Sequence, residues 1–338
     1  MKTLVVIVNY KTPALVADCL RSLAPQVRDD MHVVVTDNAS PDDSVAQIAR
    51  TIADEGYGAW CTFLPLGRNG GFAYGNNEAI ARYLDVPRCS TAAGASEEPA
   101  AALQRGTARG NDTFEYVWLL NPDTVVLDDA LVELERFLDT HPTAGIAGGR
   151  AENRDGTVRR SSFRFHSPLG ELESAVNFGP VSRALKSHVV APPIPQTPEK
   201  VGWVSGASMM VRREVFEKIG LLDAGYFMYF EETDFCLRAE RAGFECWYVP
   251  ASRIIHLVGQ ASGVTGAQRV AKRRPKYWFD SRKRYFKNNF GGATLHAANL
   301  FWLAGYPIGR VWQLARLKPR EDPPRLWWDF LRYNYFAR

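Results

Sequence analysis

The sequence lacks several signatures by which protein classes are commonly recognised. Its five cysteines are odd in number and form no CxxC pair, which argues against a disulfide framework or structural zinc and predicts free thiols. Neither a dinucleotide-binding GxGxxG nor a Walker GxxxxGK[ST] sequence occurs, so hydride transfer and P-loop chemistry are disfavoured. The function has to be sought in other patterns.

Long hydrophobic runs are also absent. The best apolar stretch, 297–309, contains Asn299 and Pro307 and stops at Arg310, so it falls short of the roughly 18 to 20 apolar residues of a membrane-spanning helix. The first residues form a strand-like apolar run without a basic leader or a cleavage site. We expect a cytoplasmic protein. The alternative location to test is a peripheral position on the inner face of the cytoplasmic membrane.

Charge is unevenly distributed along the 338 residues. From residue 267 to the end there are 16 Lys and Arg against 4 Asp and Glu, whereas the preceding residues carry 25 against 33. Aromatic residues are interleaved with the basic ones, and the periodicity over 269–287 and 295–317 predicts helices. This composition suits an anionic membrane surface. Helix packing or a homodimer interface is the alternative, and nucleic-acid binding is disfavoured because no recognition module is present.

Short apolar runs alternate with helical patterns in the first part of the chain. The runs are 4–8, 33–36, 62–64 and 116–120, separated by segments such as 13–23 and 75–83. This alternation predicts an α/β fold in which a mostly parallel central sheet has helices on both faces.

The composition also suggests a division of the chain. We expect a catalytic domain at 1–266, with a nucleotide-binding half at about 1–149 and an acceptor half at about 150–266. Within the first half, about 85–113 is rich in Ala, Gly, Ser, Thr and Glu without periodicity, which predicts a flexible surface insertion. Residues 267–338 form the basic, aromatic, helical C-terminal region.

Polar side chains follow each predicted strand. The first strand is followed by Asn9 and Tyr10, the second by Asp37 and Asn38, the third by 68–72 and the fourth by 121–124. Ligands of open α/β sheets bind beyond the carboxyl ends of the strands. We therefore expect these four loops to converge on one crevice.

Asp123 lies in the turn Asn-Pro-Asp-Thr directly after a predicted strand. A carboxylate in this position suits Mg2+ or Mn2+, which bind between one or two carboxylates and substrate phosphates. Asn-Pro-Asp is equally good turn chemistry, so the tripeptide leaves both interpretations open. His256 ends a strand-like run and could complete the coordination as a neutral imidazole, although a lone histidine is more often structural.

A second acidic cluster, Glu231-Glu232-Thr233-Asp234, follows the aromatic run 226–230 and starts a predicted helix. Acids at a helix start can serve only as caps with a favourable dipole interaction. A carboxylate beside so much apolar surface, however, has a raised pKa, which suits a general base acting on a hydroxyl.

Two weaker segments are candidates for nucleotide binding. Asp37 begins Asp-Asn-Ala-Ser, which is a helix-capping sequence that in a nucleotide crevice can instead bind a base or ribose. Asn69 and Gly71 belong to Arg-Asn-Gly-Gly-Phe, whose glycines allow the backbone to approach a ligand closely. A glycine pair alone is weak evidence.

Together these motifs resemble family 2 glycosyltransferases, and most closely the rhamnosyltransferase-like branch of bacterial cell-surface polysaccharide synthesis. The resemblance spans about residues 3–260. Its elements are Val-Asn-Tyr at 8–10, Asp-Asn-Ala-Ser at 37–40, Asn-Gly-Gly-Phe at 69–72 with Asn76 and Asn77, Asn-Pro-Asp at 121–123, Gly-Trp-Val-Ser-Gly-Ala at 202–207, Tyr-Phe-Met-Tyr-Phe-Glu-Glu-Thr-Asp at 226–234, and His256. Seven motifs in family order are more specific than any one of them.

The resemblance implies a GT-A fold, an inverting displacement and a divalent metal, Mg2+ or Mn2+. By motif position it implies that Asp123 and His256 bind the metal and that Glu232 is the catalytic base, where Asp is more usual. Asn121 stands in the place of the first acid of the metal motif. Beyond these roles, we hypothesise nucleotide binding for Asn9, Tyr10, Asp37, Asn69, Gly71, Asn76 and also Asp123, and sugar or acceptor binding for Trp203, Gly206, Glu231 and Asp234.

The resemblance also favours particular partners. The donor implied first is dTDP-rhamnose, followed by a UDP-hexose or UDP-galactofuranose, and the acceptor is a glycan or a polyprenyl-diphosphate-linked glycan. A nucleotidyltransferase would use similar acids but should carry a glycine-rich basic loop near the N-terminus, which this sequence lacks. A non-catalytic nucleotide-sugar binder would not need the complete set Asp123, Glu232 and His256.

Overall fold

A computed structural model describes residues 2–86, 114–257, 272–317 and 322–336 of the chain. Its centre is a sheet that, among these residues, runs in the spatial order β3 (Cys61–Pro65), β2 (Met31–Asp37), β1 (Thr3–Asn9), β4 (Tyr116–Leu120), β11 (Ser208–Arg212), β6 (Ala144–Glu152), β12 (Glu245–His256) and β5 (Thr124–Val126). Two short strands extend it, β7 (Val158–Arg159) beside β6 and β9 (Glu199–Val201) beside β12. A separate small sheet pairs β8 (Ser162–Phe163) with β10 (Trp203–Val204).

The first four strands are parallel, as the alternating pattern predicts. β1 lies between β2 and β4, and all of its residues are buried, which explains its uninterrupted apolar run. Beyond β4 the sheet becomes mixed, because β11 is antiparallel to both β4 and β6. The carboxyl ends of β1, β2 and β4 lie at one edge of the sheet.

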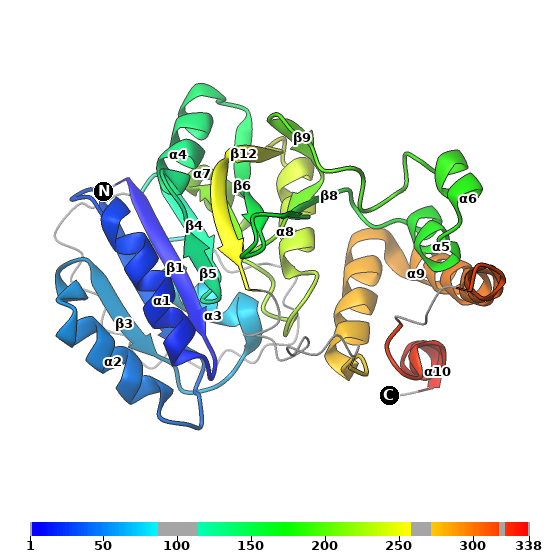
Figure 1. The fold of residues 1–338 in the computed structure, drawn as a ribbon, viewed down its shortest axis with the longest axis horizontal. Coiled ribbons are helices and arrows are strands. Elements are labelled where there is room, and N and C mark those ends of the chain that lie inside the picture. Colours follow the sequence, from blue (N-terminus) through cyan, green and yellow to red (C-terminus); the bar gives the residue numbers. More distant parts are fainter. Residues whose placement is uncertain (1, 87–113, 258–271, 318–321, 337–338) are drawn as a thin grey trace.

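Helices cover both faces of this sheet (Figure 1). Alternate residues of β1 point to opposite faces: Val5 and Ile7 belong to one hydrophobic cluster, and Leu4 and Val6 to the other. The first cluster is completed by α1 (Pro13–Leu23), α2 (Ser44–Asp54) and α4 (Ala130–Thr140), the second by α3 (Gly71–Tyr83), α7 (Arg213–Ile219) and α8 (Glu231–Arg241). The short helical turns η1 (Ala24–Gln26) and η2 (Tyr57–Ala59) lie in the connections.

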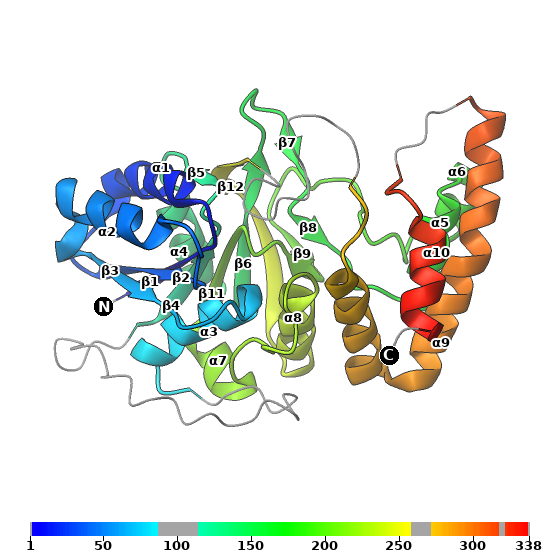
Figure 2. The same cartoon turned by 90° about the horizontal axis from the view of Figure 1, so that it is seen from below.

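The C-terminal region is helical, as its periodicity predicts. The long helix α9 (Lys276–Ala315) is interrupted at Gly291, whose φ of 85° is non-helical. Its second half packs on α5 (Pro168–Val176), close to α6 (Gly179–Ala184), α10 (Leu326–Leu331) and η3 (Arg332–Phe336), and these helices lie together at one side of the molecule (Figure 2). A Cβ added at Gly309 would lie 2.4 Å from the carbonyl oxygen of Ala175, so this close helix contact requires glycine.

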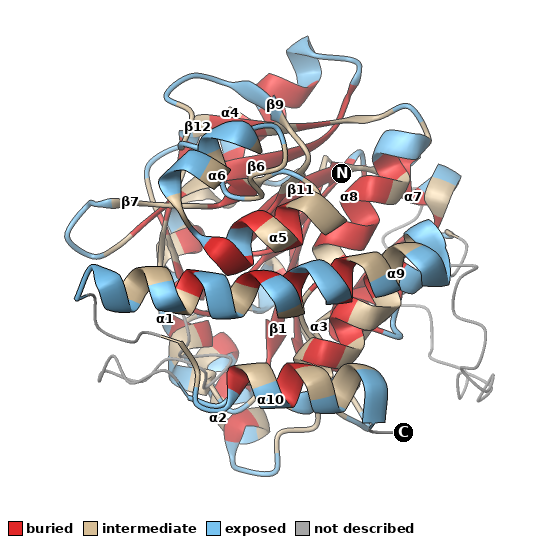
Figure 3. Ribbon diagram, turned by 90° about the vertical axis from the view of Figure 1, so that its right-hand side faces the viewer, coloured by how far each residue is buried: buried red, intermediate tan, exposed pale blue. Residues whose placement is uncertain are grey.

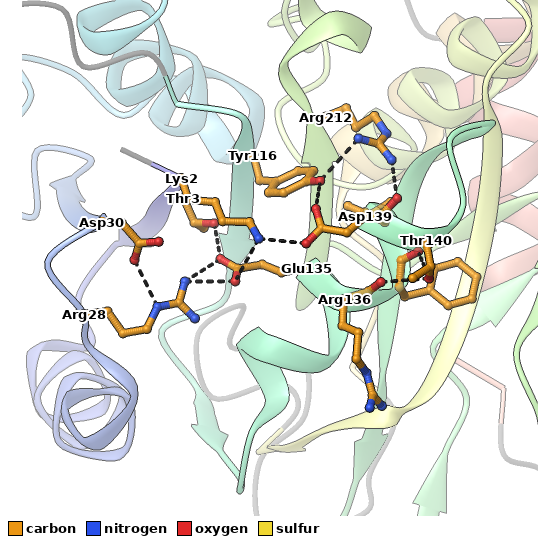
Figure 4. A network of polar contacts seen from close by, with 12 residues as sticks. Lys2, Thr3, Arg28, Asp30, Tyr116, Glu135, Arg136, Asp139, Thr140 and Arg212 are labelled. Carbon is orange, nitrogen blue, oxygen red and sulfur yellow. Dashed lines mark hydrogen bonds and ion pairs between the residues drawn. The ribbon is translucent and has the colours of Figure 1, made fainter.

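The amino-terminal edge of the sheet is held by a polar network (Figure 4). Glu135 of α4 accepts hydrogen bonds from Thr3 Oγ1 and, at 2.9 Å, from Arg28 Nη2. Asp139 accepts hydrogen bonds from Lys2 Nζ at 2.8 Å and Tyr116 Oη at 2.6 Å. The network ties α4 to the start of β1 and β4.

Some predictions concern residues that the structure does not describe. The insertion predicted at 85–113 lies outside the described residues, apart from 85–86, and so does the boundary predicted at 266. Among the described residues, no helix is long and apolar enough to cross a membrane. The cysteines that are described are free and buried, namely Cys19, Cys61, Cys236 and Cys246.

Candidate active site

A cavity of about 460 Å³ opens at the carboxyl-terminal edge of the sheet. It is lined by residues that follow β1, β2 and β4, so the polar strand ends converge on one crevice, as the sequence predicts. The predicted site residues that line it are Tyr10, Asn69, Gly71, Asp123, Gly206, Glu231, Glu232 and His256. Their individual roles stay predictions.

Strand pairing brings Asp123 and His256 together. β12 runs antiparallel to β5 with His256 opposite Thr124, and Leu257 N donates a hydrogen bond of 2.9 Å to Asp123 O. As a result, His256 Nε2 lies 3.3 Å from Asp123 Oδ1 and 3.4 Å from Asn121 Nδ2. Asp123 is buried, and its Oδ1 accepts no hydrogen bond from any described residue.

This arrangement fits a divalent cation. A buried carboxylate oxygen that accepts no hydrogen bond is costly unless a ligand satisfies it. Carboxylate oxygen and neutral imidazole are both suitable ligands for a metal. In the described part of the chain, no group of three or more His, Cys, Asp or Glu side chains could enclose a metal. Asp123 and His256 would therefore supply only part of the coordination, leaving the rest to substrate phosphates and water.

Glu231 and Glu232 begin α8 on another wall of the same cavity. Glu231 is buried, and burial together with the neighbouring charge of Glu232 raises its pKa well above the usual range. Glu232 is half-buried and lines the cavity. Burial raises the pKa of its carboxyl to about 7, although hydrogen bonds from the backbone N–H groups of Glu232 and Gly206 oppose this rise. A carboxylate with a pKa near neutrality suits a general base.

The turn before α8 positions these carboxylates. Tyr229 and Phe230 have φ values of 70° and 69°, in the left-handed region that bulky side chains disfavour. Two hydrogen bonds of 3.0 Å hold the turn: Phe227 O accepts one from the first turn of α3, and Met228 O accepts one from Ser281 Oγ of α9. The strained turn is thus clamped between two helices.

Gly71 is needed at this clamp. Its φ is 87°, and an added Cβ would lie 1.8 Å from Phe227 O. Asn69 Oδ1 accepts a hydrogen bond from Gly71 N, and Asn38 Nδ2 donates one to Gly71 O, both at 3.0 Å. The glycine therefore makes room for another part of the protein backbone, in addition to lining the cavity.

The remaining predicted residues do not line the cavity. Asn9 Nδ2 donates to Asp37 Oδ2 at 2.7 Å, and both residues are buried. Asn76 is buried under the first turn of α3, where its Nδ2 donates to Phe72 O. Their roles in nucleotide binding stay predictions.

Two predicted acceptor residues also point elsewhere. Trp203 stacks on Phe163, with ring centroids 4.1 Å apart, because β8 and β10 are paired. Asp234 is buried, and its carboxylate accepts hydrogen bonds from Arg238 Nε at 2.9 Å and Asn289 Nδ2 at 2.7 Å. As placed, Asp234 fixes α8 to α9.

Several residues that line the cavity had no site role predicted for them. Asn38 lines the cavity beside the predicted Asp37, and Phe227, Tyr229 and Tyr277 supply an aromatic wall. The ring of Tyr277 lies 5.3 Å from that of Phe227 and 6.2 Å from that of Tyr229, measured between centroids. Tyr277 belongs to the first turn of α9, where no motif distinguishes it from the other aromatic residues.

Known structures define the class of fold. The described chain is similar to that of the mannosyltransferase PcManGT from Pyrobaculum calidifontis, solved in complex with GDP-Man and Mn2+. The TM-score is 0.53 at 16% sequence identity, with 94% of this chain and 75% of that chain covered. At this identity the likeness shows the fold alone, and it confirms the predicted GT-A architecture with its helical C-terminal region.

Sequence comparison then gives the family. Residues 2–290 match the family described as "Glycosyltransferase like family 2", and this chain therefore belongs to that family. A relative from Mycobacterium tuberculosis, N-acetylglucosaminyl-diphospho-decaprenol L-rhamnosyltransferase, is 25% identical over 272 residues, covering 79% of this chain and 80% of the relative. Rhamnosyltransferase WbbL from Escherichia coli is 27% identical over 142 residues, covering 42% and 52%.

Proposed function

We propose that this glycosyltransferase is metal-dependent and inverting, and that it transfers a sugar from a nucleotide diphosphate to an acceptor hydroxyl. The observation that carries the proposal is the single cavity shared by the Asp123–His256 pair and Glu232. Inversion requires one displacement at the anomeric carbon, with one base and no carboxylate nucleophile. The cavity offers these parts.

In the proposed reaction, ionised Glu232 withdraws the proton of the acceptor hydroxyl as its oxygen attacks the anomeric carbon. The new C–O bond forms on the face opposite the diphosphate while the bond to the diphosphate breaks, so the anomeric configuration inverts. The proton remains on Glu232 and leaves to solvent through the cavity, and the nucleoside diphosphate departs. Asp123 and His256 would hold Mg2+ or Mn2+, whose positive charge would offset the negative charge of the departing diphosphate.

We assign the two ends of the cavity to different parts of the substrates. Tyr10, Asn38 and Asn69 are proposed to bind the nucleoside, since they follow the first three strands, where nucleotides bind in open α/β sheets. The aromatic wall, with Tyr277, is proposed to pack against the acceptor. Gly206 and Glu231 are proposed to bind the transferred sugar or the acceptor.

We further propose dTDP-rhamnose as the donor, with a UDP-hexose or UDP-galactofuranose as alternatives. The names of the two relatives, both rhamnosyltransferases, support rhamnose. The first name also contains a diphospho-decaprenol, which supports a polyprenyl-diphosphate-linked glycan as acceptor. Such an acceptor would place the reaction at the inner face of the cytoplasmic membrane.

The donor proposal is tested by ligand-induced stabilisation. A ligand that binds only the folded state raises the melting temperature, so dTDP with Mn2+ should do so more than UDP or GDP with Mn2+. The assay is then repeated with the matching nucleotide sugars. For a sugar that binds, we would measure the release of nucleoside diphosphate and determine the anomeric configuration of the product. A product that retains the donor's configuration would contradict the inverting mechanism, and stabilisation by UDP alone would favour the alternative donors.

A further inference from the structure

The second half of α9 exposes an apolar stripe. None of the exposed residues between 300 and 315 carries a charge. They are Leu300, Phe301, Ala304, Pro307, Ile308, Val311, Leu314 and Ala315. Their spacing places them on one side of the helix over about 22 Å. Ile308, Val311 and Leu314 are 58%, 68% and 64% exposed, which is unusual for large apolar side chains in contact only with water.

The opposite side of the same helix is firmly packed. Gly305 lies against Ala175 and Val176 of α5, and Trp302 stacks on Phe330 of α10 with ring centroids 3.9 Å apart. Figure 3 shows α9 and α10 running side by side on this face of the molecule, each with exposed segments. Because α9 packs on α5 and α10 through its other side, the apolar stripe faces solvent.

A second row of exposed residues lies along the neighbouring α10 and η3. Aromatic and basic side chains alternate at helical spacing, namely Arg325, Trp328, Arg332, Tyr335 and Phe336. Trp328 and Phe336 are 67% and 75% exposed. Tryptophan and tyrosine among arginines are typical of helices at a membrane–water interface. We call the two rows together the α9–α10 face.

The charge of this face is positive. The described acids of residues 272–336 are engaged by cations, Asp280 by Lys276, Asp322 by Arg310 and Asp329 by Arg273. Arg316, Arg325 and Arg332 are exposed, and none has an acidic partner among the described residues. Arg316 directly follows the apolar stripe, Arg325 and Arg332 belong to the second row, and all three are available to an anionic partner.

We infer that the α9–α10 face binds an anionic lipid bilayer, with the second half of α9 lying in the plane of the interface. Apolar side chains would enter the acyl boundary while the arginines contact lipid headgroups. A second copy of the chain fits less well, because a two-fold interface would bury the arginines of both copies while the described acids of this region are already paired. The first turn of α9 supplies Tyr277 to the cavity, so one helix would connect the membrane to the acceptor side of the site.

Sedimentation with lipid vesicles tests this inference on the full-length protein, independently of sugar transfer. Wild-type protein should bind vesicles of phosphatidylcholine with 30% phosphatidylglycerol more tightly than pure phosphatidylcholine vesicles. The double variant Ile308→Gln and Val311→Gln removes apolar surface without changing charge, and it should lower partitioning about tenfold or more. Arg325→Glu should lower partitioning to the anionic vesicles about fivefold or more.

Matched variants at exposed positions of the catalytic domain serve as controls. Val132→Gln and Arg50→Glu lie on α4 and α2, and both should bind vesicles as the wild type does. Melting temperatures and nucleotide binding show that every variant is folded. Equal binding by wild type and the double variant would overturn the inference. The inference would also be overturned if the wild type did not bind vesicles but formed a dimer, and the double variant was a monomer. The face would then be an interface between copies of the chain.

Discussion

The two edges of the central sheet use buried carboxylates in opposite ways. At the amino-terminal edge, Glu135 and Asp139 accept hydrogen bonds from basic and hydroxyl groups (Figure 4). At the carboxyl-terminal edge, Asp123, Glu231 and Glu232 each keep one buried oxygen that accepts no hydrogen bond from the described residues. Burying an unpartnered polar atom costs stability, so natural proteins keep such atoms mainly where a ligand satisfies them. The comparison separates carboxylates that hold the fold from those that we propose to act on substrate.

The largest expected effect is at Asp123. Asp123→Asn should lower the rate of transfer by about 10³-fold, because a neutral amide would hold the divalent metal that offsets the diphosphate charge more weakly than the carboxylate does. It should also abolish the Mn2+-dependent part of the thermal stabilisation by nucleoside diphosphate. Asp139→Asn is the matched control at the other edge, and its folded fraction should retain wild-type turnover. Equal loss of turnover in both variants would remove the distinction between the edges.

Glu135→Ala should lower stability and leave turnover unchanged, the reverse of what we expect for Asp123→Asn. Removing this carboxylate leaves the buried hydroxyl of Thr3 without its acceptor, whereas the partly exposed Arg28 keeps its contact with Asp30. The free energy of unfolding in urea should therefore fall by about 2 kcal/mol. The protein that remains folded should keep its turnover and its affinity for nucleotide. A specific loss of activity without loss of stability would show that the amino-terminal edge also serves the reaction.

The raised pKa of Glu232 predicts a pH-dependent change in stability. In the folded protein its pKa is about 7, above the value of about 4.5 of an unperturbed carboxyl, so the unfolded chain binds fewer protons between these values. The contribution of Glu232 to stability therefore falls as the pH rises from 4.5 to 7. Glu232→Gln lacks this titration and should be more stable than wild type by on the order of 2 kcal/mol at pH 8, with little difference at pH 4. Parallel stability curves for the two proteins would contradict the assignment.

The smallest expected effect is at the aromatic wall. Tyr277→Ala should raise the KM for the acceptor about tenfold with little change in kcat, since the ring is proposed to bind the acceptor rather than to react. Tyr277→Phe keeps the ring and should behave as wild type. A fall in kcat at unchanged KM would mean that Tyr277 acts by positioning the turn 227–230 instead.

Much of the fold follows from local sequence. The apolar runs that form β1, β2, β3 and β4 are short, uninterrupted and bounded by turns, so their type and order could be predicted, and with them the edge where ligands bind. Tertiary pairing decides the rest. Asp123 meets His256 only because β12 pairs with β5, and Trp203 turns toward Phe163 only because β10 pairs with β8.

The site could be predicted to the motif and not always to the residue. Asp37 and Asn38 are adjacent, but Asp37 is buried and hydrogen-bonded to Asn9 and Ser40, whereas Asn38 lines the cavity. Tyr277 has no local signal, since it reaches the cavity through the packing of α9 on the clamped turn. The double left-handed conformation of Tyr229 and Phe230 likewise depends on contacts from distant helices.

The central claim is that Glu232 is an unpaired base, and turnover by Glu232→Gln tests it most directly. Single-turnover transfer should fall by about 10³-fold while the affinity for nucleoside diphosphate with Mn2+ is unchanged. In the wild type, kcat/KM should rise with pH through about 7, the pKa to which burial raises this carboxyl, and this rise should be lost in the residual activity of the variant. Near wild-type turnover by Glu232→Gln with the same pH profile would contradict the account.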